Sequence, residues 1–237
     1  MSCRVAMLKM HRDGIIKLPP PTCLAPKPYQ PTYSDEGNSA PQWQGTVTDL
    51  QKLAIEPVLR RKDLRLWNEF MARYHYLGYK MLPGAQYRYF IKDGDQILGL
   101  MGFGAAAWKV APRDDFIGWK AHEREARLHL IVNQSRFLIL PWIYCKNLAS
   151  KSLAMVASRL SDDWDRVYGY RPVLMETFVE NGRFFGTCYK ADNWHRVGNT
   201  QGRSKLDRFH TQSVPVKSIW LKALSHDFRQ QLVGGQS

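Results

Sequence analysis

Residues 147–179, NLASKSLAMVASRLSDDWDRVYGYRPVLMETFV, combine the pattern of an amphipathic helix with that of a buried strand. Within residues 153–167, apolar side chains recur at steps of three and four, which predicts one helix capped by Asn147 and ended by Gly169. Residues 171–179 are short and apolar, which is typical of a strand covered on both faces. A helix that leads into a buried strand indicates an α/β domain.

The segments around this stretch predict the rest of one sheet. Residues 63–80 predict a helix with Asp63 as its N-cap, and residues 86–110 predict a hairpin around the turn at Asp93 and Gly94. Further strands are expected within residues 127–140, 194–200 and 216–224, and a short helix within residues 181–191. The expected fold class is therefore α/β, with a mixed central sheet flanked by helices.

The distribution of proline divides the chain into four segments. Residues 1–18 show a helix, a glycine and a strand, which we interpret as the remnant of a helical module. Residues 19–45 contain seven of the 13 prolines and predict a linker or a wrapping arm. The α/β domain is expected at residues 46–224, and a tail follows at residues 225–237.

The chain carries 34 Lys and Arg residues against 21 Asp and Glu residues, which gives a net charge of +13 over 237 residues. Such an excess favours polyanionic partners, because each neutralised phosphate releases condensed counterions. The longest apolar run, residues 136–146, is too short to cross a bilayer and contains a proline, so no membrane partner is expected. The four cysteines lack CxxC spacing, and the pair Asp114 and Asp115 has no clear third acidic partner, so no metal site is predicted. Scattered cysteines also predict reduced thiols in a cytoplasm.

Residues 181–222 contain eight basic residues against Asp192 and Asp207, with aromatic side chains between them. Basic loops with interleaved aromatic residues contact phosphates and bases, whereas the alternative is an ordinary solvated surface. Nucleic-acid contacts are predicted for Arg183, Arg196, Arg203, Lys205 and Arg208.

Two residues are candidates for catalysis, and each has a second interpretation. Glu176 follows an apolar strand, where a carboxylate acts as a general base or pairs with an arginine such as Arg136 or Arg183. Tyr189 donates a proton or stacks on a base in one interpretation, and fills the core in the other.

Polar side chains inside apolar segments predict a pocket. Asn133 and Arg136 interrupt a hydrophobic strand and need partners, so they either shape a pocket or satisfy a break in the strand. Asn193 and Trp194 complete the predicted pocket. Cys188 has no histidine at an informative spacing, which favours a buried thiol over a nucleophile.

Several long motifs occur in order along the chain: CRVAMLKMHRDGIIKLPPP (3–21), GFGAAAWKVAPRDDFIGW (102–119), NQSRFLILPW (133–142) and GTCYKADNWHRVGNTQGR (186–203). Together they resemble the DruA family, which is named for the Druantia anti-phage system. The resemblance implies a bacterial protein of phage defence or of a mobile element, since related domains accompany transposase-like proteins. It also implies DNA or RNA as a partner, and other defence or transposition proteins.

The expected element order also resembles the GNAT superfamily of acyl-CoA-dependent N-acyltransferases. In that fold a loop and a helix N-terminus hold the cofactor pyrophosphate, and the resemblance implies Asn147 and Ser150 as the contacts here. The glycines of the superfamily's loop are absent from this segment, which leaves the cofactor unknown. The resemblance further implies Tyr189 as general acid and Glu176 as base.

These features lead to three hypotheses. The first is a nucleic-acid-directed protein whose pocket engages a nucleotide or a base. The second is an acyl-CoA-dependent N-acyltransferase. The third is a non-catalytic scaffold that binds defence partners, so enzymatic activity stays open at the level of the sequence.

Overall fold

The structure is a computed structural model that describes residues 3–20, 31–202 and 214–234. The chain forms two units, residues 1–30 and residues 31–237. In the first unit, helix α1 (Cys3–Arg12) ends just before Gly14, whose φ of +73° is a conformation that glycine adopts without strain. The expected helix and its glycine stop are confirmed.

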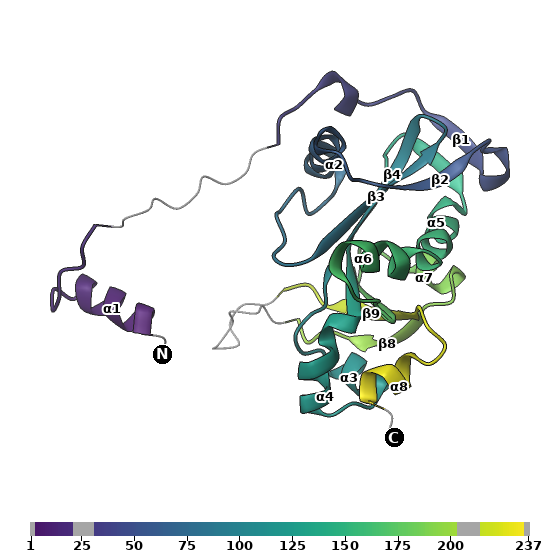
Figure 1. The fold of residues 1–237 in the computed structure, drawn as a ribbon. Coiled ribbons are helices and arrows are strands. Elements are labelled where there is room, and N and C mark those ends of the chain that lie inside the picture. Colours follow the sequence, from purple (N-terminus) through teal and green to yellow (C-terminus); the bar gives the residue numbers. More distant parts are fainter. Residues whose placement is uncertain (1–2, 21–30, 203–213, 235–237) are drawn as a thin grey trace. The chain divides into compact units, whose positions relative to one another are not determined.

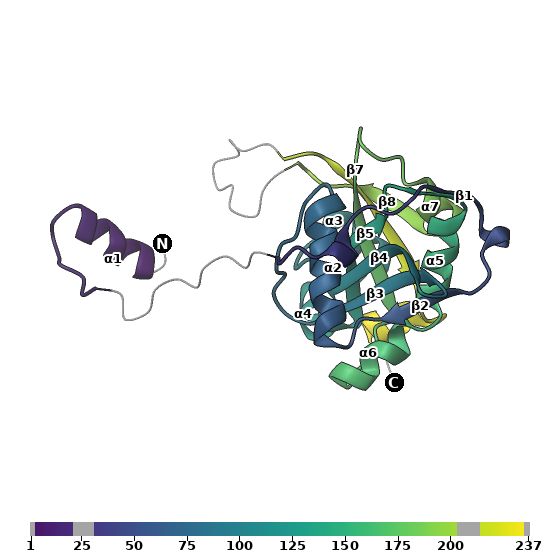
Figure 2. The ribbon, with the colours of Figure 1, turned by 90° about the horizontal axis from the view of Figure 1, so that it is seen from above.

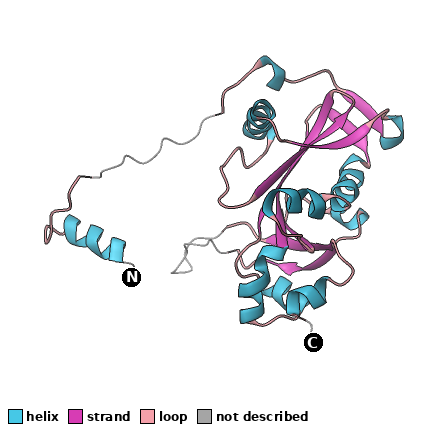
Figure 3. Cartoon of the chain, viewed as in Figure 1, coloured by secondary structure: helices cyan, strands magenta, loops and turns pink. Residues whose placement is uncertain are grey.

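The second unit is built on a seven-stranded mixed sheet (Figures 1 and 3). Neighbouring strands of this sheet are antiparallel, except that β5 and β7 are parallel. In spatial order the strands are β2 (Leu53–Pro57), β3 (Gln86–Asp93), β4 (Gln96–Ala105), β5 (Ile131–Ile139), β7 (Leu174–Glu180), β9 (Lys217–Ala223) and β8 (His195–Asn199). The mixed sheet with flanking helices confirms the expected α/β class.

Helices flank the sheet, and Figures 1 and 2 show α2 and α5 on opposite sides of β3 and β4. The helices are α2 (Arg61–Tyr74), α3 (Ala111–Ile117), α4 (Ala121–Arg127), α5 (Leu148–Ala157), α6 (Leu160–Tyr168), α7 (Thr187–Ala191) and α8 (Phe228–Val233), with 3-10 turns η1 (Asp35–Gly37), η2 (Val47–Asp49) and η3 (Leu128–Leu130). Trp67 of α2 and Leu153 of α5 are buried in the larger hydrophobic core. A second core contains Ile219 of β9 and Phe228 of α8.

The second half of the proline-rich segment belongs to this unit. Ser34 donates its backbone N–H and its hydroxyl to the buried carboxylate of Glu69, each at 2.8 Å. Strand β1 (Trp43–Thr46) pairs in parallel with β6 (Ile143–Lys146), and neither strand was expected from the sequence. The compact unit therefore begins at Pro31, upstream of residue 46, where the sequence suggested its start.

The prediction of a single helix over residues 147–169 is wrong, because the chain breaks between α5 and α6. The Arg159 guanidinium lies at this break and donates to the Ile55 carbonyl at 2.7 Å and to the buried Asp163 carboxylate at 2.6 Å. These contacts attach the break to β2. Apolar periodicity does not reveal such a contact, so it gives one helix instead of two.

Two other local predictions also differ from the structure. The N-cap of α2 is Arg60, and its guanidinium bonds the carboxylate of Asp63 at 2.8 Å. The segment around Asp114, for which no helix was predicted, forms α3, and Pro112 lies in its first turn, where proline suits a helix.

None of the helices in residues 3–20, 31–202 and 214–234 combines the length and the apolar content that a bilayer crossing requires.

Candidate functional site

Strands β5 and β7 are parallel neighbours that separate after a short paired segment. They pair only where residues 131–133 lie opposite residues 174–176. Just beyond this segment, an irregularity in the pairing of β5 with β4 leaves Ser135 without a register partner. A bulge of this kind bends its strand, which accounts for the separation of β5 from β7.

A cavity of about 570 Å³ lies where the two strands part. Its walls come from residues 133–137 of β5, residues 177–179 of β7, residues 75–77 after α2, and residues 183–189 around the start of α7. The volume is within the range of roughly 300–1,000 Å³ that is typical of small-molecule sites. The predicted pocket residues Asn133 and Arg136 both line it.

The charged side chains that line this cavity are cations. Arg136, Arg183 and Lys217 are lining residues, and among residues 3–20, 31–202 and 214–234 neither Asp nor Glu contributes to the wall. None of these three cations forms an ion pair with a carboxylate of the described residues. Concave surfaces lined by one sign of charge focus the field, so the cavity attracts anions.

His75 is a buried, neutral side chain in the same wall. Its Nδ1 accepts the Leu77 N–H at 3.2 Å. Burial, together with the charges of Arg136 and Arg183, lowers the pKa of His75 to about 4. An anion bound beside the two arginines would offset their charge and raise this pKa.

Aromatic rings alternate with the arginines around the cavity. The Arg183 guanidinium lies 4.4 Å from the centroid of the Tyr76 ring, and Phe184 meets Tyr76 edge-on at 5.3 Å. Phe185 follows, with 88% of its surface exposed. This arrangement suits a ligand that carries both a negative group and a planar ring.

Two amide side chains of β5 also line the cavity. Asn133 Oδ1 and both polar atoms of the Gln134 side chain are buried, without a hydrogen-bond partner in the part of the chain that the structure describes. Since buried polar groups are nearly always paired, these atoms can donate to or accept from a ligand.

Tyr189 lines the cavity as a buried side chain, packed edge-on against Trp194 at 5.1 Å. Burial raises the pKa of its phenol, which is therefore neutral. Burial also raises the pKa of the neighbouring Cys188 to about 11, so this residue is a thiol and not a thiolate at neutral pH.

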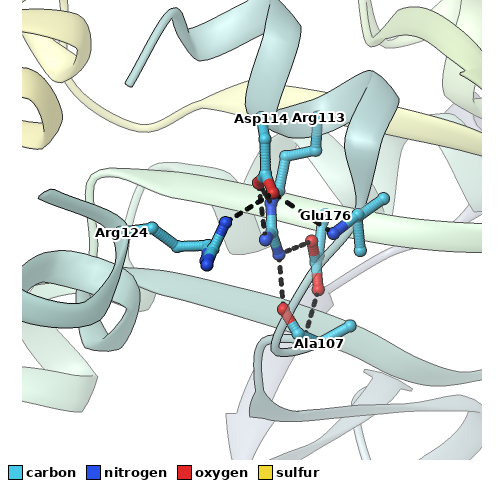
Figure 4. Close-up of polar contacts among 6 residues, drawn as sticks. Ala107, Arg113, Asp114, Arg124 and Glu176 are labelled. Atoms are coloured by element: carbon cyan, nitrogen blue, oxygen red, sulfur yellow. Dashed lines mark hydrogen bonds and ion pairs between the residues drawn. The ribbon is translucent and has the colours of Figure 1, made fainter. Parts of the chain in front are cut away.

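Glu176 is fully buried and is not part of the cavity wall. Its Oε1 accepts the Ala107 N–H at 2.7 Å, and its Oε2 accepts a hydrogen bond from Arg113 at 2.9 Å (Figure 4). Arg113 is also fully buried and donates to the Ala107 carbonyl and to the Asp114 carboxylate, each at 2.7 Å. Every charge in this network has a partner of opposite sign or a hydrogen bond.

This network corrects two expectations about Glu176. Its arginine partner is Arg113, and not Arg136 or Arg183, because α3 carries a guanidinium to β7. Glu176 and Tyr189 do not share the cavity, so the structure does not bring together the two residues named as base and acid. Burial raises the pKa of Glu176, and the ion pair with Arg113 opposes this rise.

The residues expected at a cofactor loop lie outside the cavity. Asn147 is exposed and precedes α5 with a φ of +67°, and its carbonyl accepts the Ser150 hydroxyl at 3.1 Å.

Asn193 and Trp194, which were predicted to complete the pocket, also lie outside the cavity. Asn193 is exposed, with a φ of +56°. Trp194 is buried and donates its indole N–H to Asp192 at 2.8 Å. It lines a neighbouring hollow instead of the cavity.

The predicted nucleic-acid contacts are only partly described by the structure. Arg183 lines the cavity, and Arg196 is exposed on β8, where it bonds Asn199 at 2.9 Å. Arg203, Lys205 and Arg208 lie outside the described residues.

The cavity wall also contains residues that were not predicted as site residues from the sequence, namely His75, Tyr76, Phe184, Phe185 and Lys217. The available signal was the pair of phenylalanines between Gly182 and Gly186, since glycines on both sides of two large apolar residues indicate a loop.

The fold and the cavity define an α/β protein whose central parallel strands part around a cationic site with an aromatic rim. The family model described as DruA, Druantia protein DruA, matches residues 24–234, so the chain belongs to the DruA family. A curated relative, the Druantia protein DruA of Escherichia coli, is 32% identical over 123 residues. The match covers 48% of this chain and only 30% of that protein.

Solved structures similar to the chain are acyl-transferring enzymes, the class that the element order resembled. They include a GNAT-family acetyltransferase from Bacillus cereus (9% identity, 57% of this chain and 69% of that chain, TM-score 0.36). An N-acyl amino acid synthase from uncultured soil microbes has 10% identity over 73% of this chain and 92% of that chain, with a TM-score of 0.43. An aminoglycoside acetyltransferase in complex with coenzyme A has 12% identity over 72% of this chain and 95% of that chain, with a TM-score of 0.45. At these identities and TM-scores, the similarity says nothing about activity.

Proposed function

We propose that the chain binds nucleic acid and that the cavity between β5 and β7 takes one of its nucleotide units. The observation that carries this proposal is the composition of the cavity wall, to which the described residues contribute three cations, no carboxylate and several aromatic rings. Arginine and lysine pair with phosphates, and aromatic rings stack on bases. The net charge of +13 adds a long-range attraction for a polyanion.

Arg136 and Arg183 contribute in different ways. Arg136 is half-buried in the wall, and burial lowers the pKa of its guanidinium, so a bound phosphate would offset the cost of its desolvation. Arg183 is exposed and stacks on Tyr76, which restricts the guanidinium plane before a ligand arrives.

As a member of the DruA family, the chain is proposed to act in bacterial phage defence or in a mobile element, in the cytoplasm. Other defence or transposition proteins are proposed as its partners. Nucleic-acid binding would be the step that directs it to foreign DNA or RNA.

Equilibrium binding to fluorescently labelled DNA and RNA oligonucleotides, measured over a range of salt concentrations, tests this proposal. We expect binding to weaken as salt rises, because association releases counterions. Changing Arg136, Arg183 and Lys217 together to alanine should weaken binding at least about tenfold and lower the slope of log K against log salt by roughly 2–3.

A matched control comes from Arg60, Lys62 and Arg171, whose side chains are 82%, 75% and 58% exposed and lie outside the cavity. Their triple alanine variant removes the same net charge and should bind nearly as the wild type does. An equal loss in both variants would contradict the assignment to the cavity. Failure to bind any oligonucleotide would contradict the proposed function itself.

Tyr189 favours a second candidate function, that of an N-acyltransferase. Its neutral phenol lines the cavity and meets the chemical requirement of a general acid. In that case acetyl-CoA should raise the Tm of the wild type, and Tyr189→Phe should retain this stabilisation but lose acyl transfer. Stabilisation by neither acetyl-CoA nor oligonucleotides would favour the scaffold hypothesis.

A further inference from the structure

The loop between β7 and α7 carries two adjacent phenylalanines, Phe184 and Phe185, which we call the Phe184–Phe185 ridge. Both side chains line the cavity, and both also line a second hollow of about 660 Å³. The second hollow includes Lys190 and Arg196 and, like the cavity, has neither Asp nor Glu among the lining residues that the structure describes. The ridge therefore borders two cationic depressions at once.

Phe185 is exposed to an unusual degree. Its exposed fraction of 88% is the largest among the large apolar side chains of residues 3–20, 31–202 and 214–234. Phe184 beside it is 45% exposed. Single exposed apolar residues are common on proteins, but here two rings adjoin and cations flank both sides. Packing of the core does not account for this arrangement.

The backbone on either side of the ridge is fixed. Before the ridge, the Asn181 N–H donates to the Val216 carbonyl at 3.0 Å. After it, Gly186 adopts a φ of +69° and lies so close to Trp220 that an added Cβ would be 2.7 Å from the indole ring. One end of the loop is thus held by the residue before β9 and the other packs on Trp220 of β9, which restricts the backbone that carries Phe185. A preorganised ring loses little entropy on binding.

We propose that the Phe184–Phe185 ridge stacks on an unpaired base of a single-stranded nucleic acid whose backbone passes from one hollow to the other. This inference rests on the proposed function and adds that the nucleic acid is single-stranded. Bases inside a duplex are covered above and below by their neighbours, whereas a single strand offers base faces to an exposed ring. The cations of the two hollows would hold phosphates on either side of the stacked base.

Oligonucleotides that contain one 2-aminopurine test this inference, offered to the full chain as a single strand and as a duplex of the same sequence. The emission of 2-aminopurine falls when the base stacks on an aromatic ring. We expect the single strand to bind about tenfold or more tightly than the duplex and to be quenched on binding. Phe185→Ala should lose about tenfold in single-strand affinity, lose the quenching, and keep the salt slope, since no charge is removed.

Tyr144 provides the matched control, because its ring is 58% exposed and lies in neither hollow. Tyr144→Ala should bind as the wild type does, and Phe185→Trp should keep both affinity and quenching. An unchanged Tm would show that Phe185→Ala folds normally.

Equal affinity for duplex and single strand, or unchanged binding by Phe185→Ala, would overturn the inference. Neither result would contradict the proposed function, provided that the triple alanine variant of Arg136, Arg183 and Lys217 binds oligonucleotides less tightly than the wild type does. Normal binding by that triple variant, or no oligonucleotide binding at all, would instead refute the proposed function.

Discussion

Glu176 on β7 and Arg136 on β5 belong to neighbouring strands, yet their charges have opposite surroundings. Both oxygens of Glu176 are bonded, one by Arg113 and one by the Ala107 N–H, and no part of the side chain is exposed. Arg136 bonds the Ser135 carbonyl at 2.7 Å and, within the described residues, no carboxylate. An enclosed charge with complete partners holds a fold together, whereas a cation without an anion is available to a ligand.

The largest effect should come from breaking the enclosed pair. Arg113→Ala leaves the Glu176 carboxylate buried without its cation, and we expect the free energy of unfolding to fall by about 3–5 kcal/mol. Urea unfolding measures this loss. A double variant, Arg113→Met with Glu176→Leu, should recover much of it, because the buried charge is then removed altogether. A loss below about 1 kcal/mol in Arg113→Ala would show that the pair does not hold the fold.

Glu69 is a second enclosed carboxylate and should give an intermediate effect. It accepts both hydrogen bonds of Ser34 and pairs with Arg73 at 2.8 Å. Glu69→Ala should lower the free energy of unfolding by about 1–3 kcal/mol, since Ser34 and the partly buried Arg73 lose their acceptor. It should also speed proteolysis within residues 31–38. A cleavage rate equal to that of the wild type would contradict this role of Glu69 in holding the segment.

Arg136→Ala should show the reverse behaviour. Because Arg136 has no carboxylate partner among the described residues, its removal should change the free energy of unfolding by less than about 1 kcal/mol. The same variant should weaken oligonucleotide binding. A stability loss as large as that of Arg113→Ala would contradict the proposed difference between the Arg113–Glu176 pair and Arg136.

The effect of His75 is the smallest near neutral pH, because it appears only in acid. His75 has a folded-state pKa of about 4, below the ordinary 6.5, so the unfolded chain binds more protons between these values. The free energy of unfolding should therefore decrease as pH falls from 6.5 toward 4, and this contribution should be constant above 6.5. His75→Gln should flatten that part of the profile in urea unfolding.

The same histidine reports on the cavity. A bound oligonucleotide should raise the pKa of His75, because phosphate offsets the charges of Arg136 and Arg183. NMR titration of the imidazole measures the change. Titration of the free protein near 6.5 would contradict the buried, arginine-flanked environment of His75.

The sheet was largely predictable from the sequence, and the helical detail was not. The apolar run before Glu176 and the turn at Asp93 and Gly94 depend on local patterns, and both elements are present. The break at Arg159 depends on a carbonyl 104 residues away, and the ion pair of Glu176 joins residues 63 positions apart. Local periodicity contains no information about such distant partners.

The candidate site was predictable only where polar side chains interrupted an apolar strand. Asn133 and Arg136 stood out because polar side chains inside an apolar strand need a reason. Phe184 and Phe185 fell within the segment predicted as a short helix, whereas the structure places them in the loop before α7. The contacts predicted for residues 203–208 stay predictions, because they fall outside the described chain.

Photocrosslinking of the full chain to an oligonucleotide that contains 4-thiothymidine, followed by mass-spectrometric mapping, tests the central claim most directly. A nucleotide in the cavity between β5 and β7 predicts adducts within residues 75–77 and 183–189, which line it. Adducts confined to segments away from the cavity, such as residues 160–168 of α6, would contradict the account.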